Sequence, residues 1–142
     1  MALYQDNAKK FVVVLNKKLA PSTLMNALGH VTAGLGSKVG PDEPDYLDYK
    51  CPAGGFTSAI SRYPFIVLAA PNGSQVRKLT QECGRLDIPS NAFVTAMLGA
   101  SAQEQMAATE QATEQDLEFV AVAVFGAAEQ LDPLTRKFSL WR

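Results

Sequence analysis

Four short segments rich in apolar residues divide the chain: 11–15, 65–70, 91–98 and 117–125. The first two are apolar at every position, which is typical of strands buried on both faces. Each segment has the length of a strand, and helical repeats or turn residues separate them. The pattern predicts four strands, and residues 138–141 predict a short fifth strand at the end of the chain.

The residues after the first strand repeat with the period of a helix. Pro21 and Ser22 predict its start, with Ser22 as the N-cap, and Gly34 and Gly36 predict its end. One side of this helix is expected to face the core because its apolar residues form a single stripe. The residues of the stripe are Leu24, Leu28, Val31 and Leu35.

A second helix is predicted after the turn at residues 71–74, which follows the second strand. Its apolar residues recur at intervals of 3, 4 and 3. Cys83 belongs to this apolar stripe, so we expect the thiol to pack in the core and to be inert. The residues of the stripe are Val76, Leu79, Cys83 and Leu86.

Two more helical segments follow. Ser101 and Glu104 have the spacing of a capping box and open a helix to about Gln115. This helix is rich in Gln, Ala and Glu, so we expect most of it to be solvated. Asp132 and Pro133 predict a last helical turn, with Asp132 as its N-cap and Pro133 at the first helical position.

Residues 37–55 lack a clear period and are rich in proline, glycine and acidic residues. We predict a loop here, with a short edge strand at residues 46–50. Loops this long in compact domains are often functional. A loop that only covers a sheet edge explains the segment equally well.

The alternation of apolar strands with helices predicts a three-layer α/β/α fold. We expect a mixed, mostly parallel sheet of four to five strands. Neither an internal repeat nor a linker is visible, so residues 1–142 are predicted to form a single domain. Residues 1–8 are predicted to be a flexible N-terminal extension.

Composition and charge limit the classes of function. The chain has 142 residues, of which 47% are hydrophobic, enough for a core without disulfides or metals. Its formal net charge is −1, and nucleic-acid binding normally requires a basic excess. The sequence therefore argues against a nucleic-acid partner.

The cellular location is predicted from processing signals and cysteines. The first residues lack the apolar stretch of a signal peptide, and we find no apolar run long enough to span a membrane. Cys51 and Cys83 lie far apart in the sequence, as in reduced intracellular proteins. We predict a cytoplasmic protein with no membrane partner.

Few residues are suited to catalysis or metal binding. His30 is the single histidine, which excludes zinc sites with two or more histidines. The two cysteines do not form a Cys-x-x-Cys pair, and the nucleophile motif Gly-x-Ser-x-Gly is absent. We therefore predict no metal and no cofactor.

One group of polar residues remains as a candidate site. Asn26 and His30 are four residues apart, so they lie on one side of the first helix, roughly opposite its leucine stripe. Ala27, Ala33 and Gly34 on that side are small and would let a ligand or another chain approach.

The end of the first strand extends this candidate site. Asn16, Lys17 and Lys18 follow the strand and precede the helix. Ligands collect at the carboxyl ends of strands in open α/β sheets, and the start of a helix favours anions. We therefore predict ligand binding by Asn16, Lys18, Asn26 and His30, with His30 as the candidate catalytic residue for proton transfer. The alternative is that Asn26 and His30 are simply exposed or lie at a homodimer contact.

Several segments resemble an uncharacterised bacterial family of domains of unknown function, whose fold is similar to that of type II peptidyl-tRNA hydrolases. The resemblance covers roughly residues 9–142 and implies a mixed sheet flanked by helices and a homodimer. Gly126, Asp132 and Thr135 also match the C-terminal pattern of the hydrolases. The segments that carry the family resemblance are residues 10–19, 26–30, 34–36, 61–68 and 131–142.

The resemblance does not transfer the hydrolase activity. The hydrolases have a lysine near the start of the first helix, where this chain has residues 22–26 without a lysine. They also carry an acidic residue after the third strand, where residues 94–98 contain no carboxylate. The matching Gly126, Asp132 and Thr135 are interpreted as structural.

Three functions remain open. The first is binding of a small anionic or nucleotide-like ligand. The second is hydrolysis of an acyl or aminoacyl ester, with His30 handling a proton. The third is a non-catalytic homodimeric interaction protein, which would dimerise through the small-residue side of the first helix.

Overall fold

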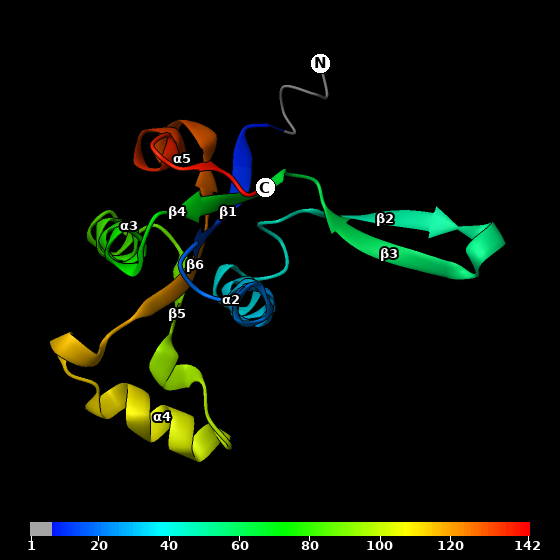
Figure 1. Cartoon of the computed structure of the whole chain (residues 1–142). Coiled ribbons are helices and arrows are strands. Elements are labelled where there is room, and N and C mark those ends of the chain that lie inside the picture. Colours follow the sequence, from blue (N-terminus) through cyan, green and yellow to red (C-terminus); the bar gives the residue numbers. More distant parts are fainter. Residues whose placement is uncertain (1–6) are drawn as a thin grey trace.

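The computed structural model describes residues 7–142 and contains a five-stranded mixed sheet with the strand order β5-β6-β1-β4-β7 (Figure 1). β1 (Lys9–Asn16) and β6 (Phe119–Ala127) occupy the middle of this sheet. β4 (Phe65–Ala70) lies on the other side of β1, while β5 (Ser90–Val94) and β7 (Ser139–Leu140) form the edges. Each of the five predicted strands is present, but β5 ends at Val94, whereas residues 91–98 were predicted, and residues Thr95–Met97 form a short 3-10 helix.

The sheet is mixed as predicted, but the expectation that it is mostly parallel is wrong. β1 and β4 are parallel, whereas the pairs β1–β6, β5–β6 and β4–β7 are antiparallel. The continuous apolar runs led to this error. β6 is as apolar as a parallel strand because helices cover both faces of the sheet, whatever its direction.

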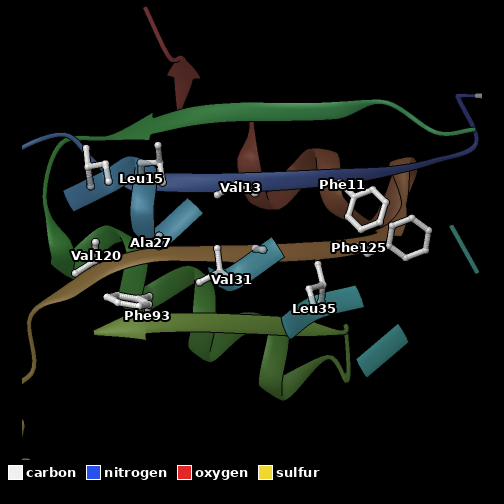
Figure 2. Close-up of a cluster of buried hydrophobic side chains, with 12 residues drawn as sticks. Phe11, Val13, Leu15, Ala27, Val31, Leu35, Phe93, Val120 and Phe125 are labelled. Carbon is white, nitrogen blue, oxygen red and sulfur yellow. The ribbon is translucent and has the colours of Figure 1, made fainter. Parts of the chain in front are cut away.

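One face of the sheet packs against α2 (Pro21–Val39), as Figure 2 shows. The odd-numbered residues of β1 point to this face, and the rings of Phe11 and Phe125 lie 4.5 Å apart between their centroids. The helix contributes its buried stripe, and Phe93 of β5 joins the cluster. The buried residues of the stripe are Leu24, Ala27, Val31 and Leu35.

The opposite face packs against α3 (Gly73–Arg85) and α5 (Ala128–Thr135). Val12 and Val14 of β1 point to this face, where they join Cys83 and Leu131 in a second buried cluster. Helices therefore lie on both faces of the sheet, which confirms the three-layer arrangement. Cys83 is fully buried, as predicted.

The first helix is longer than predicted. It begins at Pro21 after Ala20, which makes no side-chain cap, so Ser22 is not the N-cap. It continues through Gly34 and Gly36 to Val39 and ends at Gly40, whose φ of 83° favours glycine. Tertiary packing of Leu35 on the sheet keeps the helix intact through the two glycines.

The predicted cap of α4 (Ala102–Gln111) is confirmed, because Ser101 accepts a hydrogen bond from the Glu104 backbone. α3 begins at Gly73, inside the predicted turn, and Asn72, which was not predicted as a cap, accepts a hydrogen bond from the Gln75 backbone. Asp132 is not an N-cap, because α5 begins four residues earlier, at Ala128. The Asp132 carboxylate instead forms an ion pair with Lys10 of β1.

Residues 37–55 do not form one loop. The end of α2 takes the first residues, and β2 (Tyr46–Cys51) pairs with β3 (Phe56–Ser61) in an antiparallel hairpin. The predicted strand at residues 46–50 is confirmed, but its partner β3 was missed. The hairpin projects away from the central sheet and does not cover one of its edges (Figure 1).

The remaining expectations concern the first residues and membranes. Residues 1–6 of the predicted flexible extension lie outside the described part of the chain, while the Ala8 carbonyl accepts a hydrogen bond from the Ala128 backbone. Over residues 7–142, none of the helices combines the length and the apolar character that a membrane span requires.

Candidate functional site

A hollow with a volume of about 750 Å³ lies between α2, β5 and α4, beside an edge of the sheet. Ligand sites of small molecules typically have volumes of about 300–1,000 Å³. The lining of the hollow comes from three separate parts of the chain, so only the folded protein forms this hollow. The lining residues are Asn26, His30, Val31, Asn91, Ala92, Phe93, Met97, Leu98, Gly99, Gln105, Met106, Thr109 and Glu110.

The α2 wall carries the two residues that the sequence singled out on this helix. Asn26 and His30 are both exposed and lie one helical turn apart. Neither side chain has a hydrogen-bond or ion-pair partner among residues 7–142. Both polar groups are therefore available to a ligand.

The β5 wall holds His30 in place. The imidazole stacks on the buried ring of Phe93, with 6.1 Å between the ring centroids and 26° between the planes. One face of the imidazole is therefore covered by an apolar ring. This contact restricts the orientation of His30 without using either of its nitrogens.

Asn91 of β5 ties the strand to α2. Its Nδ2 donates a hydrogen bond of 3.2 Å to the Val31 carbonyl oxygen. A Cβ atom on Gly34 would lie only 2.3 Å from this nitrogen, so the amide fits because residue 34 is glycine. Lys38 adds a second tie by donating to the Ser90 carbonyl oxygen at 2.9 Å.

The third wall is the long connection between β5 and β6, which contains α4. Leu98 is 46% exposed and Met106 is 64% exposed, although both are large apolar residues lining the hollow. Gln105 Nε2 donates a hydrogen bond of 2.9 Å to the Gly99 carbonyl oxygen, which fixes the entry into α4. The connection thus presents solvent-exposed apolar side chains to the hollow.

The ionisable groups of the lining are His30 and Glu110, and no lysine or arginine is among the lining residues of the described chain. Glu110 has no ion-pair partner within residues 7–142. A carboxylate without a neighbouring cation makes the local potential negative at neutral pH. This charge pattern favours anions less than a lining with a lysine or arginine would.

Asn16 lies away from this hollow and is fully buried. Its Nδ2 donates to the Phe119 carbonyl oxygen at 3.0 Å and to Glu118 Oε1 at 3.4 Å. Its Oδ1 accepts a hydrogen bond of 3.0 Å from the Lys18 backbone. The Asn16 side chain thus joins the end of β1 to the start of β6.

Lys18 is exposed and does not line the hollow either. The structure therefore brings together two of the four predicted ligand-binding residues, Asn26 and His30, and separates them from Asn16 and Lys18. Lys17 lies in a different hollow, beside the C-terminal residues of the chain.

The small residues on α2 do not form the open face that the helical pattern predicted. Ala27 is fully buried in the core, and Gly34 is covered by Asn91 of β5. Ala33 remains exposed. The helical pattern misplaced Ala27 because the buried stripe of α2 is rotated slightly from the predicted leucine stripe, and Leu28 is only partly buried.

Sequence reasoning missed the β5 and α4 walls. Phe93 was predicted only as part of a strand, and the α4 residues only as part of a solvated helix. One signal was present, because Met106 is a large apolar residue inside an otherwise polar and alanine-rich helix. Without tertiary structure, nothing placed Met106 in the same hollow as His30.

Metal binding has no support in residues 7–142, where no three His, Cys, Asp or Glu side chains gather as potential ligands. His30 and Glu110 line the same hollow, but they are too few for a metal site without further ligands.

Known proteins are similar to this chain in sequence family and in fold. The family model described as "Protein of unknown function (DUF2000)" matches residues 9–142. A solved structure of a protein of unknown function from Agrobacterium tumefaciens is similar, with a TM-score of 0.78 and 21% identity. The match covers 95% of this chain and 98% of the other and shows a shared fold. The search of curated proteins found no match.

Proposed function

This chain belongs to the DUF2000 family of proteins of unknown function. We propose that it binds a small molecule in the α2–β5–α4 hollow. Asn26 and His30 provide the polar contacts from α2 in this proposal. Asn16 and Lys18 are not among the proposed contacts, because Asn16 is committed to structural hydrogen bonds and Lys18 lies elsewhere.

The observation that carries the proposal is the combination of exposed apolar and unpaired polar groups in one concave surface. Leu98 and Met106 are large apolar residues that remain about half exposed or more, at 46% and 64%. Burying such side chains under a ligand is favourable by about 25 cal/mol per Å² of apolar surface. Asn26 and His30 supply the few oriented polar groups that a binding site needs for specificity.

A thermal-shift screen with a small-molecule library tests the proposal. We expect at least one compound to raise the melting temperature of the wild-type protein, because a ligand that binds only the folded state stabilises it. The shift should be smaller for His30→Ala and for Asn26→Ala. Met25→Ala is the matched control, since Met25 is exposed on α2 beside Asn26 but does not line the hollow.

The proposal fails if every compound shifts the wild type and both site variants equally. It also fails if Leu98→Trp, which fills part of the hollow, leaves binding unchanged. The melting temperature of each variant without ligand separates a loss of binding from a loss of folding.

Ester hydrolysis is a second candidate, favoured by the presence of an imidazole and a carboxylate in the same hollow. An acyl or aminoacyl ester bound there would meet His30 as a base for a water molecule. His30→Ala should then abolish turnover. Assays with peptidyl-tRNA and simple esters that show no turnover above buffer would exclude this candidate.

Self-association is a third candidate, and the β2–β3 hairpin favours it. Its paired residues place Leu47, Tyr49, Phe56 and Ile60 on one face. Tyr49 and Phe56 are 55% and 56% exposed. An isolated two-stranded hairpin is marginally stable in water, so burial of this face against the same face of a second copy would stabilise it.

Sedimentation at micromolar concentration tests self-association. A homodimer should dissociate when Tyr49 and Phe56 are both replaced by serine. Serine substitutions of Asp48 and Lys50, which lie on the other face of the hairpin, serve as the matched control. A wild-type monomer contradicts this candidate.

The similarity to type II peptidyl-tRNA hydrolases belongs to the proposal as a relationship of fold. The three residues that match the hydrolase pattern have structural contacts here: Asp132 pairs with Lys10, the buried Thr135 Oγ1 donates to the Leu131 carbonyl oxygen, and Gly126 lies within β6. Superposition on a hydrolase structure tests the relationship, and a different order of the five strands would contradict it.

A cytoplasmic location is also part of the proposal. Cys51 and Cys83 are both unpaired, as expected in a reducing compartment. Fractionation of the source cells, followed by detection of the protein, tests this location, and recovery outside the cytoplasm would contradict it.

A further inference from the structure

The lining of the hollow also carries information on the class of ligand, and this step rests on the proposed function. We propose that the ligand is a planar heterocycle without negative charge, of the nucleobase or nucleoside class. The hollow has about 750 Å³, which falls within the range for ligands of this size.

The charges around the hollow argue against a phosphate. Glu110 lines the hollow, while lysine and arginine do not occur in its described lining. Residues 101–116, which include α4, contain four acidic residues and no basic residue. Arg77 is already paired with Glu114. A phosphate would therefore bring its negative charge into a negative potential without a compensating cation.

The backbone of α2 provides no anion site at this place either. Free N–H groups belong to the first turn of a helix, which begins at Pro21. Asn26 and His30 lie further along, where the backbone N–H groups are bonded within the helix. The hollow thus has no lysine or arginine in its described lining and no free backbone N–H group from α2 for a phosphate.

The polar groups match the edge of a heterocyclic base instead. Asn26 presents a carbonyl oxygen and an NH₂ group, and both are free of partners within the described chain. Nucleobase edges carry donors and acceptors side by side, and asparagine amides recognise them by paired hydrogen bonds.

The apolar groups match the faces of such a ring. The His30 imidazole, which stacks on Phe93, lies on one side of the hollow, and the exposed Leu98 and Met106 belong to the connection between β5 and β6. Bases stack on aromatic side chains in many single-strand binding proteins. Thioether groups such as that of Met106 also make favourable contacts with aromatic rings.

Isothermal titration of the full chain with four nucleosides and their 5′-monophosphates tests this class. We expect at least one of adenosine, guanosine, cytidine and uridine to bind. The corresponding monophosphate should bind about three- to tenfold more weakly, because its charge meets Glu110 in a partly solvated site. Added salt should reduce this difference by screening the repulsion.

A variant without the Glu110 charge makes the test specific. Glu110→Gln should reduce the difference in affinity between the nucleoside and its monophosphate. Glu104→Gln is the matched control, because it removes the same charge from α4 at a position that does not line the hollow and keeps a residue suited to the capping box. This control variant should change the difference in affinity less than Glu110→Gln does, because Glu104 does not line the hollow.

The other outcomes distinguish a wrong ligand class from a failure of the proposed small-molecule binding. A monophosphate that binds as tightly as its nucleoside, or more tightly, overturns the inference on charge. If library compounds bind in a His30-dependent manner but no nucleoside or free base competes with them, the ligand class is wrong and the proposed function stands. If neither the library nor the nucleosides bind, both fail.

Discussion

The side-chain amide of Asn91 packs directly on Gly34 of α2, where a Cβ atom would lie only 2.3 Å from Asn91 Nδ2. The same nitrogen donates a hydrogen bond of 3.2 Å to the Val31 carbonyl oxygen. This contact joins the edge strand β5 to the helix that carries Asn26 and His30. The pair therefore fixes the spacing of two walls of the hollow.

Replacing Gly34 by alanine should reveal this contact through a double-mutant cycle. In a helix interior, alanine is favoured over glycine by about 1 kcal/mol. In the wild type we expect this gain to be cancelled or reversed, because Asn91 has to move and lose its hydrogen bond. In an Asn91→Ala background, Gly34→Ala should stabilise the protein. Urea unfolding of the four variants should give a coupling of about 1–2 kcal/mol, and a coupling near zero contradicts the contact.

Asn16 should be essential for stability but not for binding in the hollow. Asn16→Ala removes a buried side-chain amide that makes three hydrogen bonds. The Phe119 carbonyl and the Lys18 N–H then each lose their hydrogen bond to this amide. We expect a loss of about 2–4 kcal/mol in the free energy of unfolding. Below its melting temperature, the variant should bind any ligand of the hollow as the wild type does. A selective loss of binding in the folded variant would instead support the original four-residue site.

Cys83 should make stability depend on pH in the alkaline range. Burial, with a smaller contribution from Glu82, raises the pKa of the Cys83 thiol from 9.0 to about 11. The unfolded chain therefore releases this proton at lower pH than the folded chain, so stability is lost as the pH rises from about 9 to 11. The contribution should be roughly 2 kcal/mol. Urea unfolding from pH 8 to 11 should show a shallower decline for Cys83→Ala, and equal slopes contradict the assignment.

The same burial predicts the reactivity of the two cysteines. Cys51 is only partly buried, whereas Cys83 is fully enclosed. An alkylating reagent at pH 8 should modify Cys51 in the folded protein and reach Cys83 only after unfolding. Peptide mass mapping with and without urea measures this difference, and rapid native modification of Cys83 would contradict its burial.

The ion pair between Lys10 and Asp132 should behave as a link between β1 and α5 and not as a helix cap. The Lys10 side chain is 15% exposed and that of Asp132 is 56% exposed, so we expect a coupling of about 0.5–1 kcal/mol that weakens with salt. A double-mutant cycle with Lys10→Met and Asp132→Asn measures it. If the Asp132 substitution costs the same with and without Lys10, the ion pair contributes nothing.

Local patterns in the sequence were sufficient for most of the fold. Continuous apolar runs located the strands, and the capping box at Ser101 and Glu104 marked the start of a helix, because these signals depend on neighbouring residues alone. The direction of the strands was not encoded in the same way. β6 pairs antiparallel with β1 although its composition resembles a parallel strand, since burial on both faces selects apolar residues in either case.

The candidate site also depends partly on local sequence patterns and partly on tertiary contacts. By itself the sequence determined that Asn26 and His30 share one side of a helix, because a spacing of four residues is a property of the helix alone. Only the tertiary structure decided what faces them. Phe93, Leu98, Met106 and Glu110 come from segments more than 60 residues away, and Asn16 is turned into the interior by hydrogen bonds to β6. Packing between segments distant in the sequence determines these contacts, and helical or strand periodicity does not predict such packing.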